Sequence, residues 1–193
     1  SALGSRMKLI LLVVLAFPIW CFATSLKEFA PIVTQSNDQT HYFINVPEKY
    51  HYEKDRKIID RKASGKAYFI EADGTPKFLW ETIGWYSPEV FMCGTGSSLI
   101  RITNWHKGNK ASKEDLAIAF YINGVEIRKY STADLLENDK SIEISAGGYQ
   151  WRADKPRYPG CSYVSPGFFV RTTENRYIEF NFETGEITDK INP

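Results

Sequence analysis

The sequence predicts a mainly β fold: an antiparallel meander of β-hairpins forming a sandwich, an open barrel or a partial propeller-like arrangement, with one short helix near residues 131–138. Short runs rich in aromatic and β-branched residues alternate with glycine-containing turns along most of the chain. In three hairpins an aromatic residue also precedes the turn glycine by five positions, which is a crude internal repeat. These pairs are Phe69 and Gly74, Phe91 and Gly96, and Phe180 and Gly185.

The turns locate the strands. Asp73-Gly74 and Asn123-Gly124 each separate two strand-like runs, and glycine accepts the positive φ that tight hairpin turns require. Residues 117–122 are apolar at every position, as expected of a strand that is covered on both faces. Strands are predicted at 41–46, 67–70, 78–80, 90–92, 99–102, 117–122, 125–128, 141–145, 168–173, 177–182 and 186–188.

One helix is predicted after the strand that ends near residue 130. Ser131 or Thr132 can cap its N-terminus, and Asp134 is well placed to favour the positive end of the helix dipole. A segment of about two turns needs docking to persist. Leu135 and Leu136 are its expected packing face.

The chain divides into four predicted segments. Residues 1–6 precede Met7 and are expected to be a cloning remnant, and residues 7–23 form a signal peptide with a basic start and a small residue at its end. The apolar run Leu9–Ala23 has 15 residues, short of the roughly 20 that span a bilayer as a helix. Residues 24–64 are an extended lead-in with a possible first strand and a polar connector, and 65–193 are a single β-rich domain.

We therefore expect export to the periplasm or the medium, with an uncleaved membrane anchor as the main alternative. No later segment is apolar and long enough to cross a membrane. Without Arg6 and Lys8, 22 basic residues face 23 acidic ones, so the net charge is −1 and no nucleic-acid partner is expected. Residues 48–66 are rich in both signs of charge, which favours a solvated connector over a polyanion site.

Two cysteines, Cys93 and Cys161, remain after signal removal. In an oxidising compartment they could form a disulfide. They could equally be separate buried thiols that act as small apolar residues. The sequence leaves both alternatives open, because it does not show whether the two Cα atoms lie within bridging distance.

Catalytic and metal signatures are weak throughout. The three histidines, His41, His51 and His106, are not at metal-ligand spacing from one another, so we expect no metal site and no cofactor. The segment 94–98 (Gly-Thr-Gly-Ser-Ser) lacks the glycine that a nucleophile elbow has after its serine. A thiol nucleophile paired with His106 is less favoured than a disulfide or inert thiols.

The most arguable ligand-binding surface is the polar loop that begins at Asn104, Trp105, His106 and Lys107 and reaches Asp115. A tryptophan followed by polar side chains can stack on a sugar ring and hydrogen-bond its hydroxyls. The favoured alternative is structural: Trp105 covers the edge of the core, with its indole N–H bonded to backbone.

Three stretches carry a family resemblance: Leu79-Trp80-Glu81 with Gly84-Trp85; Phe120-Tyr121 with Gly124 and Tyr130-Ser131; and Ser145 with Tyr149 and Trp151. They resemble small exported bacterial proteins and domains of unknown function with aromatic-rich, propeller-like β-hairpins. The resemblance covers roughly residues 65–151 and implies architecture only, with no catalytic residues to carry over.

Three functions fit these observations. The preferred hypothesis is an exported, non-catalytic binding or interaction module for an unknown protein or glycan. The first alternative is a cell-envelope hydrolase that acts on glycans or peptides through His106 and nearby acids. The second is an envelope structural component that keeps Leu9–Ala23 as a membrane tether.

Overall fold

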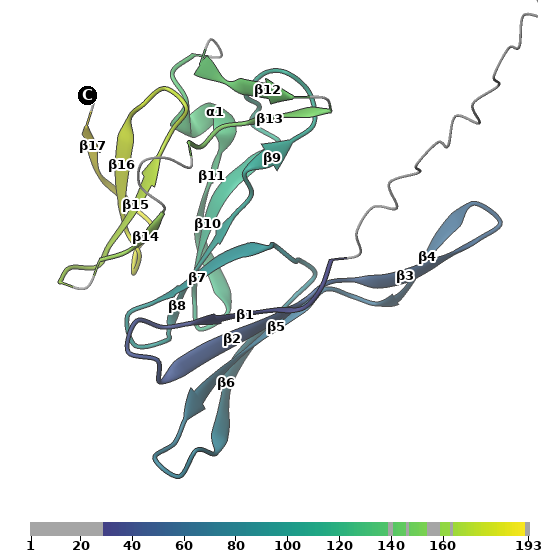
Figure 1. Cartoon of the computed structure of the whole chain (residues 1–193), viewed down its shortest axis with the longest axis vertical. Coiled ribbons are helices and arrows are strands. Elements are labelled where there is room, and N and C mark those ends of the chain that lie inside the picture. Colours follow the sequence, from purple (N-terminus) through teal and green to yellow (C-terminus); the bar gives the residue numbers. More distant parts are fainter. Residues whose placement is uncertain (1–28, 139–140, 146, 154–158, 163, 192–193) are drawn as a thin grey trace, which may run out of the picture.

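A computed structural model describes residues 29–138, 141–145, 147–153, 159–162 and 164–191 (Figure 1). The predicted cloning remnant and signal peptide lie outside these ranges. Within them the chain forms antiparallel sheets and a single short helix, so the predicted mainly β class is confirmed. No helix in the described ranges is long and apolar enough to cross a membrane.

The first sheet is an antiparallel meander in the order β1-β2-β5-β6. Its strands are β1 (Ile32–Gln35), β2 (His41–Val46), β5 (Ser64–Ile70) and β6 (Pro76–Ile83). Strand β2 matches the predicted 41–46, and Gly74 has a φ of +85° in the turn between β5 and β6. Because β2 pairs with β5 along its whole length, the expected boundary between residues 64 and 65 falls inside this sheet.

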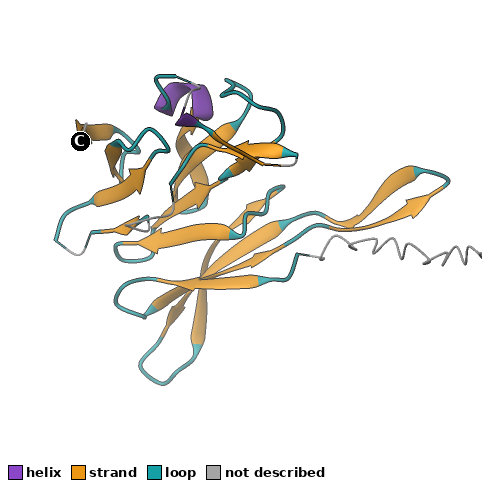
Figure 2. Ribbon diagram, turned by 45° about the horizontal axis from the view of Figure 1, so that its top comes forward, coloured by secondary structure: helices purple, strands orange, loops and turns teal. Residues whose placement is uncertain are grey.

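A hairpin is inserted between β2 and β5. It consists of β3 (Lys49–Glu53) and β4 (Arg56–Arg61), all of whose residues are exposed, and Figures 1 and 2 show it projecting away from the three larger sheets. The expected connector is therefore solvated, as predicted, but it is a regular β-hairpin. The sequence does not show the alternation of apolar and polar residues that is typical of a strand, because both faces of this hairpin carry charged side chains.

The second and third sheets repeat the four-stranded meander. The second has the order β11-β10-β8-β7, and the third has the order β14-β15-β16-β17. Strands of the second are β7 (Glu89–Cys93), β8 (Ser98–Ile102), β10 (Leu116–Ile122) and β11 (Val125–Ser131). Strands of the third are β14 (Gly160–Cys161), β15 (Gly167–Arg171), β16 (Tyr177–Asn181) and β17 (Ile187–Ile191).

The second sheet lies between the other two and is covered on both faces (Figure 1). In β10, Phe120 packs with Phe180 of the third sheet, whereas Ala119 and Tyr121 belong to a cluster with Phe43 of the first sheet. This two-sided burial confirms the prediction from the unbroken apolar run 117–122. The three meanders are stacked in sequence order, as neighbouring blades of a propeller are, and they form no closed barrel.

Helix α1 (Thr132–Leu135) closes one end of the stack. Ser131 is its N-cap: the Ser131 Oγ accepts from the backbone N–H of Asp134, whose carboxylate accepts from the backbone N–H of Ser131 at 2.8 Å. Hydrogen bonds from Lys113 and Ser131 lower the pKa of Asp134 to about 2. The predicted packing residues, Leu135 and Leu136, are both buried.

The turn between β15 and β16 holds the other end of α1. Arg176 Nη2 donates to the carbonyl oxygen of Leu135 at 2.6 Å, and the carboxylate of Glu174 accepts from the backbone N–H groups of Glu137 and Asn138. Both side chains are 6% exposed. A four-residue helix therefore persists because the third sheet satisfies its C-terminal backbone groups.

Cys93 and Cys161 form a disulfide, with their Cα atoms 5.7 Å apart. Of the two alternatives, the structure thus has the bridge, which joins β7 of the second sheet to β14 of the third. In β14, Cys161 pairs with Phe168 of β15.

Gly124 joins the first two sheets by close approach. Its φ is +82°, and a Cβ atom there would lie 2.5 Å from the carbonyl oxygen of Glu81 in β6. We expect Gly124→Val to lower the free energy of unfolding by about 3 kcal/mol, from backbone strain plus the clash. Gly74→Val is the matched control, since Gly74 has a φ of +85° and open space around it. Urea unfolding should show the smaller loss at Gly74, and equal losses would mean that the contact with β6 does not matter.

Candidate functional site

The candidate site lies on a small sheet at the same end of the molecule as α1. The sheet has the order β12-β13-β9, with β9 (Trp105–His106), β12 (Glu143–Ser145) and β13 (Gly148–Gln150). Strand β9 follows β8 closely in the chain and pairs with β13. Trp105 lies opposite Gln150, and His106 lies opposite Tyr149.

Gly148 allows this pairing. A Cβ atom at residue 148 would lie only 2.3 Å from the carbonyl oxygen of His106. Any side chain there would push β13 away from β9, so glycine is required for the close approach of the two backbones. Because β12 pairs with β13, this close approach also brings Ser145 of β12 to the surface that Trp105 lines.

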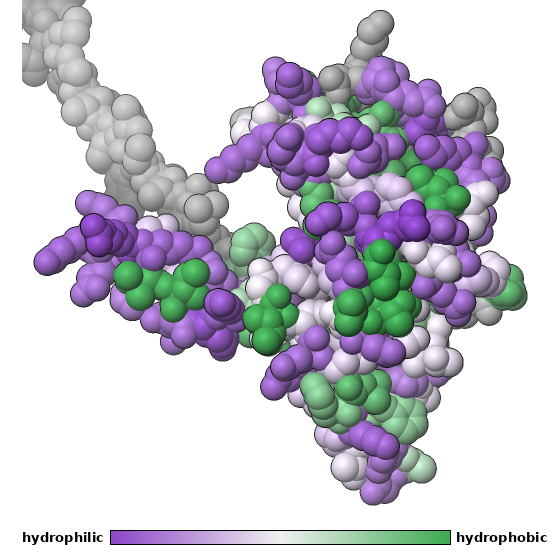
Figure 3. All heavy atoms as spheres, turned by 180° about the vertical axis from the view of Figure 1, so that it is seen from behind, coloured by the Kyte–Doolittle hydropathy of each residue, from purple (hydrophilic) through white to green (hydrophobic). Residues whose placement is uncertain are grey.

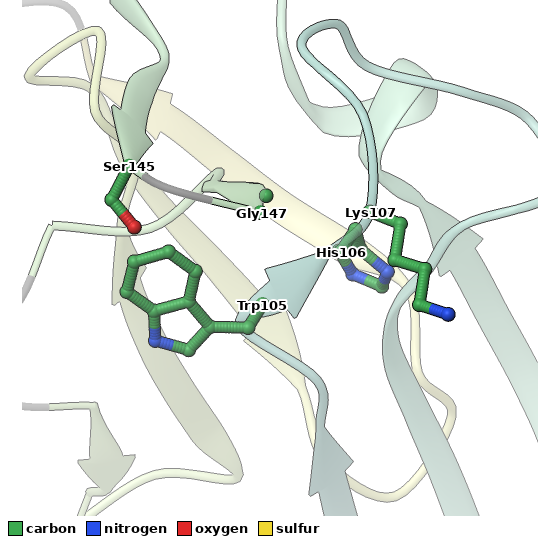
Figure 4. A pocket seen from close by; sticks show the side chains of 6 residues that line it. Trp105, His106, Lys107, Ser145 and Gly147 are labelled. Carbon is green, nitrogen blue, oxygen red and sulfur yellow. The ribbon is translucent and has the colours of Figure 1, made fainter. Parts of the chain in front are cut away.

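An open depression with a volume of about 270 Å³ lies at this sheet. Its lining residues are Trp105, His106, Lys107, Ser145, Gly147 and Gly148 (Figure 4). The side chain of Trp105 is 52% exposed and points toward Ser145, and the described residues offer its indole N–H no hydrogen-bond partner. The structural interpretation of Trp105, an indole bonded to backbone at the core edge, is therefore wrong. Trp151 has that role, because its buried indole N–H donates to the carbonyl oxygen of Thr103 at 2.7 Å.

His106 points away from Trp105 (Figure 4). Its side chain is 8% exposed, its Nε2 lies 3.0 Å from the carbonyl oxygen of Thr103, and its Nδ1 lies 3.6 Å from Oδ1 of Asp115. Both ring nitrogens thus face protein groups. The imidazole of His106 is therefore hardly accessible to a ligand in the depression. His106 contributes to this surface mainly through its backbone, which pairs with β13 next to Trp105.

Asp115 belongs to a hydrogen-bonded network behind the depression. Tyr149 donates its hydroxyl proton to Oδ2 of Asp115 at 2.7 Å, and Oγ1 of Thr132 lies 2.8 Å from the same hydroxyl oxygen. Burial, aided by the hydrogen bond to Asp115, raises the pKa of Tyr149 to about 12. This network ties β13, the loop before β10 and helix α1 together, so it fixes the sheet on which Trp105 stands.

The candidate residues named from the sequence therefore separate into two groups. Trp105, His106 and Lys107 line the depression, whereas Asp115 lies behind it. Asn104 also lies outside the lining: its side-chain oxygen accepts from the backbone N–H of Arg152 at 3.2 Å. The sequence did not connect Ser145, Gly147 and Gly148 to this surface. They follow Trp105 by about forty residues, and no local pattern records which strand pairs with β9.

A second, larger depression of about 470 Å³ lies beside β11 and α1, and it is rich in charges of both signs. Two ion pairs lie within it: Lys113 pairs with Asp134, and Lys129 Nζ lies 3.3 Å from Oε1 of Glu126. In the described parts of the chain, no three His, Cys, Asp or Glu side chains cluster as metal ligands would.

The chain matches no protein-family model, and no curated protein matches it.

Proposed function

We propose that this protein is an exported, non-catalytic binding module that takes its ligand at the depression beside Trp105. One observation carries the proposal: a half-exposed indole stands at the rim of a hollow, on a sheet fixed from behind by the network of Asp115, Tyr149 and Thr132. A tryptophan that served only to fill the core would be buried, as Trp151 is. The disulfide and the predicted signal peptide support export.

The chemistry of the lining favours a glycan. An indole face stacks on the apolar face of a sugar ring, while the Ser145 hydroxyl, toward which the indole points, can hydrogen-bond to the hydroxyls of that sugar (Figure 4). The side chain of Lys107 extends away from Trp105. The volume is slightly below the range of about 300–1,000 Å³ that is typical of pockets for drug-sized ligands. It suits one or two sugar rings at the end or side of a chain.

The hydrolase alternative has less support. A general acid or base must come within hydrogen-bond reach of the substrate. The imidazole of His106 is 8% exposed, and both of its nitrogens face the protein. The resemblance to exported proteins of unknown function stays a prediction, and so does the alternative of a tethered structural component.

The test is calorimetric titration with soluble N-acetylglucosamine oligomers and with soluble peptidoglycan fragments. We expect Trp105→Ala to weaken binding about tenfold or more, which corresponds to about 1.4 kcal/mol of binding free energy. Phe78→Ala is the matched control, because Phe78 is also 52% exposed but lies in β6 of the first sheet.

Equal affinity in the wild type and Trp105→Ala would contradict the proposal, as would the absence of binding to any of these probes. Release of shortened oligomers that is lost in His106→Ala would instead support the hydrolase.

A further inference from the structure

The larger depression, beside β11 and α1, contains a cation that has no opposite charge within reach. Its lining carries both basic and acidic side chains, namely Arg101, Lys113, Lys129, Glu114, Glu126 and Asp134. Both lysines form ion pairs, one with Asp134 and the other with Glu126. Across the described residues, no carboxylate lies within ion-pair distance of Arg101. Arg101 is thus the cation that the lining leaves unpaired.

A guanidinium without a carboxylate contrasts with the buried arginines of this fold. Hydrophilic side chains cover most of the face shown in Figure 3, so surface charge alone does not identify a site. The buried Arg152 donates to both carboxylate oxygens of Glu89. The buried Arg176 pairs with Glu137. Arg101 is half-buried, and its Nε atom is buried with no hydrogen-bond partner among the described residues. Because removing a charge from water costs free energy unless an opposite charge replaces the water, this position suits an external anion.

Neighbouring aromatic side chains hold Arg101 in a fixed orientation. Its Cζ atom lies 4.9 Å from the centroid of the Trp85 ring, a distance typical of a cation–π contact. The Trp85 ring lies 5.2 Å from that of Tyr121, centroid to centroid, and the Tyr121 hydroxyl donates to Oε2 of Glu126 at 3.1 Å. Burial raises the pKa of Tyr121 to about 12, and the nearby Arg101 opposes this rise. The guanidinium is therefore positioned before a ligand arrives, which lowers the entropic cost of binding.

The second sheet leaves space beside Arg101. Arg101 in β8 and Lys129 in β11 both lie opposite Ala119 of β10, so the three residues share one face of the sheet. A small side chain between two long ones leaves room, and the depression that the two long ones line has a volume of about 470 Å³. This volume lies within the range of about 300–1,000 Å³ that is typical of small-molecule pockets.

We propose that this depression binds the free carboxylate of an amino acid or a short peptide, with Arg101 as the counter-ion. A guanidinium presents parallel N–H groups that match the two oxygens of a carboxylate. The stacked and partly desolvated position of Arg101 strengthens such a contact, because charges interact more strongly where water is excluded.

The other charges of the lining favour a ligand that carries both signs of charge. Ser112 donates its hydroxyl proton to the Glu114 carboxylate, and within the described chain Glu114 has no cation at ion-pair distance. An ammonium group of the ligand can provide that cation. A dianion such as phosphate would instead be repelled by the three acidic side chains of the lining. Amino acids and short peptides carry a carboxylate and an ammonium together.

The test is a nuclear magnetic resonance titration of the isotope-labelled protein with triglycine and with triglycine amide. The two probes have the same length and the same ammonium group, and only triglycine has the carboxylate. We expect triglycine to shift the Nε–H resonance of Arg101 progressively at millimolar concentration. The amide should bind about tenfold more weakly, because it lacks the charge-assisted hydrogen bonds to the guanidinium.

Substitutions at Arg101 test the assignment of the counter-ion. Arg101→Gln should weaken triglycine binding about tenfold, whereas Arg101→Lys, which keeps the charge and loses the planar fork, should retain part of the affinity. Arg128→Gln is the matched control, because Arg128 lies in β11 and pairs with Glu186 outside the depression. It should bind triglycine as the wild type does, and circular dichroism should show the same strand content in all variants.

Equal affinity for triglycine and its amide, or no binding of either, would overturn the proposal without reference to any variant. Equal affinity in the wild type and Arg101→Gln would also overturn it. Inorganic phosphate that binds more tightly than triglycine, and loses its binding in Arg101→Gln, would overturn the choice of a carboxylate. Arg101→Gln should bind N-acetylglucosamine oligomers as the wild type does, since Arg101 does not line the depression beside Trp105.

Discussion

Phe120→Ala should lower the free energy of unfolding by about 4 kcal/mol, the usual size for loss of a large aromatic side chain from a core. Phe120 is fully buried in β10, where its ring lies 5.2 Å from that of Phe180 and 6.5 Å from that of Tyr130, centroid to centroid. The substitution would open a cavity where the second and third sheets meet. Urea denaturation followed by circular dichroism measures the change.

Val125→Ala provides the reference for this experiment. Val125 lies in the neighbouring strand β11 but is 66% exposed, so its substitution should change stability by no more than about 0.5 kcal/mol. A loss below about 1 kcal/mol for Phe120→Ala would mean that β10 is not covered by the third sheet. The stacking of the three meanders would then need revision.

Removal of the disulfide should have an effect of similar size. The bridge closes a loop with a sequence separation of 68 residues. On the chain-entropy description this closure contributes about 4 kcal/mol, mainly by restricting the unfolded chain. We expect the double substitution Cys93→Ala, Cys161→Ala to lose most of that stability, as measured by urea unfolding.

Two controls accompany the cysteine experiment. Thiol titration of the denatured, non-reduced wild type should find neither Cys93 nor Cys161 free. A reducing agent should lower the stability of the wild type toward that of the double variant and leave the variant unchanged. Free thiols at both positions, or no response to the reducing agent, would contradict the bridge.

The features that the sequence predicted are local ones. Asn123 and Gly124 both have positive φ in the turn between β10 and β11, as the Asn-Gly pair indicates. The unbroken apolar run 117–122 predicted burial on both faces, because a strand with one solvated face would alternate apolar and polar residues. The Ser131 cap and the acidic residue three positions later likewise identified α1. In each case the physical cause lies within a few residues of its effect.

What the sequence did not predict depends on contacts between distant segments. The sequence indicated a connector where the β3–β4 hairpin lies, because charged residues on both faces of the hairpin conceal the alternation of a strand. The depression could not be assembled either, since Ser145 and Trp105 meet only through β13. The sequence also could not distinguish Trp105 from Trp151, which differ in whether their indole N–H reaches the backbone.

The most direct test of the proposed site is a nuclear magnetic resonance titration of the isotope-labelled protein with an N-acetylglucosamine trimer. The indole N–H resonance of Trp105 should shift progressively with ligand. That of Trp151 should stay in place, because its proton is donated to Thr103 inside the core. Unchanged resonances for Trp105 and its neighbours Lys107 and Ser145 at millimolar trimer, or shifts confined to other parts of the molecule, would contradict the assignment of this surface as the ligand-binding site.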